Sequence, residues 1–143
     1  MIIVDVNLLV FAEDSESPFH RDAKAWWTAE LKRGGDIAFA WITMLSFIRL
    51  MTNPKVISNC LTSVASADRL ESWLDLPNIR IATPGPNHWV IFSGFVRKHK
   101  LSGNSIADAH LATLAIENDC LLYTADVGFS KFEALKWLNP LPH

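Results

Sequence analysis

Cysteine is scarce in this sequence of 143 residues, and its two cysteines form no recognisable motif. Cys60 and Cys120 lie far apart, without a CxxC pair and without the cysteine and histidine spacing of a structural zinc site. Neither a disulfide framework nor structural zinc is therefore expected. The two residues are typical of reduced, partly buried thiols, and we expect a cytoplasmic protein.

Long hydrophobic runs and a strong net charge are also lacking. No apolar stretch approaches the roughly eighteen residues of a membrane span. The opening segment has no basic residue before its apolar run, which argues against a signal peptide. The formal net charge is only −2, so the field of the whole protein will not draw it onto nucleic acid, and any such binding has to be local.

The sequence does contain ample material for one hydrophobic core. Half of its residues (50%) are hydrophobic, and six Trp, eight Phe and one Tyr supply large side chains. A chain of this length buries roughly two-thirds of its surface on folding. There are no repeats or low-complexity stretches, so we expect a single domain over residues 1–143.

Short apolar segments alternate with longer amphipathic segments. The former predict strands at 2–5, 36–40, 79–82, 120–124 and 135–138. The latter predict helices at 6–12, 20–33, 43–52, 62–76, 87–100 and 105–118. This alternation implies parallel strands joined by helical crossovers. The predicted fold class is α/β, a three-layer α/β/α sandwich around a mostly parallel central sheet.

Three aspartates are expected at one edge of this sheet. Asp5 and Asp126 follow predicted strands, and Asp108 lies in the first turn of a predicted helix. In such sheets ligands bind at the carboxyl ends of the strands, where the strand order reverses. Carboxylates gathered there suit a hard divalent cation such as Mg²⁺ or Mn²⁺.

Each aspartate also has a purely structural explanation. Asp5 can cap the helix that begins at Val6, and Asp126 can belong to a turn. Asp108 can complete a capping box with Ser105, with Asp in the usual Glu or Gln place. Their joint placement at one sheet edge is what favours the metal site.

Three segments carry a resemblance to a known family. These are IIVDVNLLVFA at the start, GNSIADAHLATLA at 103–115 and LLYTADVGFSKF at 121–132. In order and spacing they resemble the signature blocks of PIN-domain ribonucleases, especially the VapC-like toxins of toxin–antitoxin pairs. The resemblance spans nearly the whole chain and implies a single PIN-like domain.

The resemblance implies roles for individual residues. Asp5, Asp108 and Asp126 would be the catalytic, metal-binding carboxylates, with Mg²⁺ as the cofactor and Mn²⁺ as its substitute. Asn7 would help to order Asp5, and Thr124 would be the supporting hydroxyl.

The family usually adds a Glu on the helix after the second strand. Ser46 stands at that position here, and no acid occurs between Asp36 and Asp68. The three aspartates can still bind one metal ion well. A second metal ion would lack the ligand that this Glu supplies.

Three further features have alternative interpretations. Arg49 can contact an RNA phosphate or a cluster carboxylate, or form an ordinary ion pair. His110, roughly 200° around the helix from Asp108, is expected to face away from the cluster. Trp26 and Trp27 are neighbours on one helix and point about 100° apart, so one of them is expected to face a partner unless both are buried.

The function that the sequence favours is a metal-dependent endoribonuclease, the toxin of an antitoxin-controlled pair. Metal-activated water would hydrolyse an RNA phosphodiester, and the partners would be the antitoxin and a second copy of the chain in a homodimer. The alternative is a catalytically weakened PIN-like module that binds RNA or a partner. A receiver-like signalling domain fits poorly, because the sequence lacks its acidic pair after the first strand.

Overall fold

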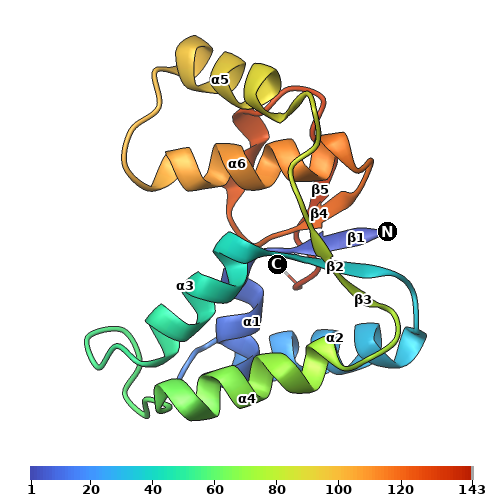
Figure 1. Cartoon of the computed structure of the whole chain (residues 1–143). Helices are drawn as coiled ribbons and strands as arrows, with labels where there is room; N and C mark the ends of the chain where they lie inside the picture. The colour runs from blue at the N-terminus through green and yellow to red at the C-terminus, as the bar shows by residue number, and fades with distance from the viewer. Residues whose placement is uncertain (143) are drawn as a thin grey trace.

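The computed structural model of the chain describes residues 1–142, and His143, the last residue of the predicted domain, lies outside the described residues (Figure 1). The strands are β1 (Ile2–Val4), β2 (Ile37–Ala40), β3 (Ile79–Ala82), β4 (Leu121–Tyr123) and β5 (Trp137–Leu138). The helices are α1 (Val6–Glu13), α2 (His20–Arg33), α3 (Trp41–Met51), α4 (Ser63–Leu74), α5 (His88–His99) and α6 (Asn104–Glu117). Every predicted element is present, with ends that differ by at most two residues; a 3₁₀ helix, η1 (Val127–Lys131), was not predicted.

The strands form one sheet in the order β3-β2-β1-β4-β5, and every neighbouring pair is parallel. The chain runs outward from β1 through β2 to β3, and then returns to place β4 on the other side of β1. The strand order therefore reverses between β1 and β4. This is the position at which open α/β sheets bind their ligands.

Helices cover both faces of the sheet, which confirms the predicted three-layer α/β/α arrangement (Figure 1). Helices α1 to α4 pack on one face and α5 and α6 on the other. All four residues of β2 are buried, as expected for a strand covered on both sides.

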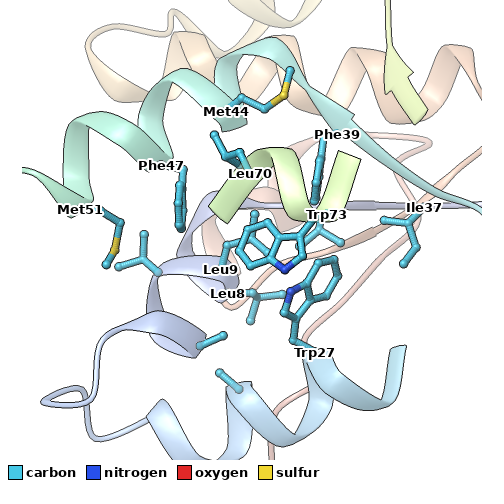
Figure 2. Packing of buried hydrophobic residues seen from close by; sticks show 14 of the residues in the cluster. Leu8, Leu9, Trp27, Ile37, Phe39, Met44, Phe47, Met51, Leu70 and Trp73 are labelled. Atoms are coloured by element: carbon cyan, nitrogen blue, oxygen red, sulfur yellow. The ribbon is translucent and has the colours of Figure 1, made fainter. Parts of the chain in front are cut away.

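The two faces have different cores. Figure 2 shows the larger core, in which the Trp73 ring packs edge-on against Trp27 and Phe47, with ring centroids 5.5 Å apart in both pairs. On the other face, α6 presents the small side chains Ala109 and Ala112, both fully buried. Small residues let α6 approach the sheet closely, which brings the start of this helix to the end of β1.

Neither Trp26 nor Trp27 is exposed, which favours the alternative that both rings pack within the monomer; that one of them faces a partner stays a prediction. Trp27 is 4% exposed in the core, and Trp26 is half-buried against Tyr123 at a ring centroid distance of 5.6 Å. Helix α2 lies against α1 and also reaches the end of β4, so Trp27 is covered and Trp26 is covered in part. The exposed tryptophans are Trp41 and Trp89, at 58% and 67%.

The structure also bears on the cysteines and on the lengths of the apolar helices. Cys120 is buried as predicted, but Cys60 is exposed in the loop after α3. Within residues 1–142, no helix has both the length and the apolar character needed to cross a membrane.

Candidate metal and active site

Asp5 lies directly after β1 and begins α1. Its backbone N–H donates to the carbonyl of Tyr123 at 2.9 Å, which continues the pairing of β1 with β4. Its carboxylate accepts two hydrogen bonds, from the Val6 N–H at 2.7 Å and from the Thr124 hydroxyl at 2.8 Å. The structural interpretation of Asp5 as a helix cap is therefore right, and it still leaves each carboxylate oxygen a lone pair for another ligand.

Thr124 is the centre of the hydrogen-bond network at this edge of the sheet. Its fully buried hydroxyl donates its only proton to Asp5. The same oxygen accepts from the Asp126 N–H at 3.0 Å and from the Asn7 side-chain amide at 3.3 Å. Asn7 thus acts on Asp5 through Thr124, and one hydroxyl fixes three of the residues that the sequence singled out.

Asp108 lies on α6 and lines a small cavity with Asp5. The cavity has a volume of about 60 Å³ and is lined by Asp5, Val6, Ile42, Thr43, Ser46, Ala107, Asp108 and Leu111. The predicted capping box is absent, because α6 begins at Gly103 without a side-chain cap and the Ser105 hydroxyl donates to the Ser102 carbonyl. Asp108 is therefore not used as a cap and is available to a ligand.

Asp126 is exposed and serves as the turn residue that its sequence context predicts. Its carboxylate accepts from the Gly128 N–H at 2.8 Å and caps η1. Within residues 1–142 no three His, Cys, Asp or Glu side chains converge into a ready-made metal centre. The carboxylate of Asp126 is turned toward Gly128, while Asp5 and Asp108 face one cavity.

The carboxylates interact electrostatically nevertheless. Burial raises the pKa of Asp5 to about 6; the charges of Asp108 and Asp126 add to this rise, and the bonds from Thr124 and Val6 oppose it. The pKa of Asp108 is also raised, first by burial and then by the charge of Asp126, with Lys131 acting in the opposite direction. A bound cation would relieve this repulsion.

The donor set of the cavity fits a hard divalent cation. Two carboxylates and the hydroxyls of Thr43 and Ser46 line it, so the side-chain ligands available there are all oxygens. The Thr43 hydroxyl is buried and has no hydrogen-bond partner, which leaves a polar atom available to a ligand.

Three other sequence-predicted residues lie as follows. Ser46 is buried and lines the cavity beside Asp5 and Asp108. Arg49 is exposed on α3 and forms no ion pair with the described residues. His110 faces away from the cluster, as predicted, and its Nδ1 lies 2.9 Å from Nε2 of His88 on α5.

Sequence reasoning missed Thr43. The available signal was its spacing from Ser46, because residues three apart lie on the same face of a helix. Both residues accordingly line the cavity.

Comparison with known proteins assigns the family. The PIN domain family profile matches residues 2–135. The chain is 33% identical to Ribonuclease VapC33 of Mycobacterium tuberculosis over 141 residues, which is 99% of each chain. The chain therefore belongs to the PIN domain family, among the VapC ribonucleases.

Solved structures show the same fold. The VapC20 toxin of Mycobacterium tuberculosis, described as cleaving the sarcin-ricin loop, matches with a TM-score of 0.69 at 16% identity, covering 95% of this chain and 99% of that one. A toxin–antitoxin complex from Klebsiella pneumoniae matches with a TM-score of 0.64 at 17% identity, covering 98% of each chain.

The raised pKa of Asp5 predicts a pH dependence of stability in metal-free buffer. Because the pKa rises from 3.8 to about 6 on folding, the folded state binds this proton more tightly than the unfolded chain. The free energy of unfolding should therefore fall as the pH rises from about 3 to about 7, by about 3 kcal/mol from this group. In Asp5→Asn the contribution of Asp5 to this fall in the free energy of unfolding should be absent. The measurement is urea unfolding at several pH values across this range.

Asp119→Asn is the matched control for this experiment. The Asp119 side chain is 91% exposed, so its replacement should leave the pH dependence of the wild type unchanged. An Asp5→Asn protein with the pH dependence of the wild type would contradict the electrostatic account of the site.

Proposed function

We propose that this protein is a metal-dependent endoribonuclease and the toxin of a toxin–antitoxin pair. The observation that carries the proposal is the shared cavity of Asp5 and Asp108 at the point where the strand order reverses, in a chain that belongs to the VapC ribonucleases. The substrate is RNA, and the bond that is hydrolysed is a phosphodiester. The proposed location is the cytoplasm, where the cell's RNA is found.

The proposed cofactor is Mg²⁺, with Mn²⁺ able to replace it, held by Asp5, Asp108 and Asp126. When bound, such a cation would supply Lewis-acid chemistry, holding a phosphate oxygen and lowering the pKa of a bound water. Asp126 needs to turn away from Gly128 to join the set, and the bound cation would have to offset the loss of the hydrogen bond that caps η1. Thr124 and Asn7 are positioning residues, because their hydrogen bonds hold Asp5 in a fixed orientation.

The surroundings of the cavity support a role in phosphodiester hydrolysis. Burial of Asp5 excludes water from one side of the carboxylate pair, which strengthens its electrostatic interaction with any bound ion. Arg49, exposed on the same helix as Ser46, has a free guanidinium that suits an RNA phosphate. The RNA backbone would then cross α3 as it enters the site.

A second candidate function is favoured by Ser46. Because this serine supplies no charge at the position where the family usually has Glu, the site has fewer ligands for metal. The protein would then bind RNA or a partner without cutting it. A cleavage assay with and without Mn²⁺ separates this candidate from the nuclease.

Asp108→Asn should abolish cleavage without unfolding the protein. Loss of one cavity carboxylate weakens cation binding, and the metal-free fold loses a repulsive charge. We expect the rate of Mn²⁺-dependent RNA cleavage to fall by about a hundredfold or more. Asp68→Asn, which changes an exposed acid on α4, should cleave at the rate of the wild type. Full activity of Asp108→Asn would refute the assignment of the site.

Ser46→Glu should strengthen cation binding. The new carboxylate would enter the cavity that Asp5 and Asp108 already line, and would add a ligand for the metal. We expect the Mg²⁺ concentration that gives half-maximal cleavage to fall by about tenfold. An unchanged Mg²⁺ requirement in a folded variant would show that another group already completes the site.

The proposed protein partners are an antitoxin and a second copy of the same chain, with residues 1–143 forming one PIN-like domain. An apolar groove of about 330 Å³ between α3 and α4 provides a surface for such a partner. It is lined by Trp41, Met44, Leu45, Ile48, Ala67, Leu70, Glu71 and Leu74. Exposed tryptophan is a frequent anchor residue of protein interfaces.

Sedimentation equilibrium should show a homodimer at micromolar concentration. Trp41→Ser should weaken self-association by about tenfold, because a large exposed ring is removed from the groove. Val127→Ser, at an exposed apolar residue outside α3 and α4, is the control and should remain dimeric. A monomeric wild-type protein at this concentration would contradict the homodimer.

A further inference from the structure

Thr43 is a buried polar residue whose hydroxyl group has no partner. Its side chain belongs to the first turn of α3, the residue is 2% exposed, and Oγ1 makes no hydrogen bond. Two other threonines, one within α6 and one at the C-cap of α3, bond to the carbonyl four residues earlier. Thr113 donates to Ala109 at 2.7 Å, and Thr52 to Ile48 at 2.8 Å. For Thr43 that residue is Phe39, which lies in β2 and not in the helix.

An unpartnered buried hydroxyl is unfavourable, because it has lost its hydrogen bonds to water and gained none in return. Such a group in a native structure needs an explanation, and an ordered water or an ion that satisfies it is one. The surroundings of Thr43 indicate which ligand this is. The side chain lines the same cavity of about 60 Å³ as Asp5 and Asp108.

Ser46 adds a second hydroxyl to the same wall of the cavity. It lies one helical turn after Thr43 and is also buried. Helix α3 thus presents two neutral hydroxyls, while α6 and the end of β1 present the carboxylates. A cavity of this size has room for water molecules between the two walls.

We propose that the hydroxyls of Thr43 and Ser46 bind the water that hydrates the divalent cation, so that α3 holds the ion through water instead of by a direct ligand. Mg²⁺ retains several of its waters when proteins bind it, and those waters hydrogen-bond to groups around the site. A hydroxyl oxygen can accept such a bond. This inference rests on the proposed function, because it concerns the cation of the same site.

Mn²⁺ alone is the probe, and its dissociation constant is measured from the electron paramagnetic resonance signal of the free ion. Thr43→Val keeps the shape of the side chain and removes the hydroxyl. We expect about tenfold weaker Mn²⁺ binding, the usual loss when a group around a metal site is removed. Thr43→Ser, which restores the hydroxyl, should bind Mn²⁺ like the wild type, and Ser46→Ala should bind it more weakly.

Thermal unfolding without metal provides the second measurement. Thr43→Val should unfold at the temperature of the wild type or higher, since the hydroxyl that it loses had no partner. Thr113→Val is the matched control. It loses an existing hydrogen bond away from the cavity, so it should unfold at a lower temperature and bind Mn²⁺ normally.

The inference is overturned if Thr43→Val binds Mn²⁺ like the wild type, or if Thr43→Ser binds it as weakly as Thr43→Val does. Should Thr43→Val fail to fold, Thr43→Ala takes its place against Thr43→Ser. Asp5→Asn separates this inference from the proposed function. If Asp5→Asn leaves Mn²⁺ binding intact, the proposed metal site itself is wrong. If it abolishes binding while Thr43→Val changes nothing, only the role of α3 is refuted.

Discussion

The hydrogen bond from Thr124 to Asp5 is the contact on which the arrangement of the site depends. It joins residues 119 positions apart in the sequence, and it exists because β1 and β4 pair in parallel with Val4 opposite Tyr123. Asp5 and Thr124 are the next residues along the two strands, so their carboxylate and hydroxyl lie within hydrogen-bonding distance. The same hydroxyl orients Asn7 and the backbone of Asp126, so a change in strand register would separate the whole group.

The metal-free site destabilises the folded state, and the rest of the fold has to offset this effect. A buried carboxylate, a second acid in the same cavity and an unpartnered hydroxyl each destabilise the metal-free protein. The two hydrophobic cores on either side of the sheet supply the opposing stability, with clusters of aromatic rings on one face and closely packed alanines on the other. A cation would remove much of this penalty, so binding and stability are coupled through the same few atoms.

The aromatic side chains on the helices differ in how far they are exposed. Aromatic side chains in the middle of α2 are covered by neighbouring elements, whereas Trp41, at the start of α3, stays largely exposed beside an apolar groove. Helical periodicity alone could not distinguish these cases, because a helix in a layered fold can be covered on more than one side. The proposed interface is therefore assigned to α3 and α4 and not to the Trp26 and Trp27 pair.

The alternation of short apolar and longer amphipathic segments by itself determined the fold class, the elements and the placement of Asp5, Asp108 and Asp126 near one sheet edge. These features depend on local patterns of side chains, which a sequence displays directly. Only the tertiary structure decided that the Thr124 hydroxyl donates to Asp5 and that Thr43 is left without a partner beside Asp5 and Asp108. Both outcomes depend on which atoms from distant segments come within hydrogen-bonding distance, and that is fixed by packing and strand register.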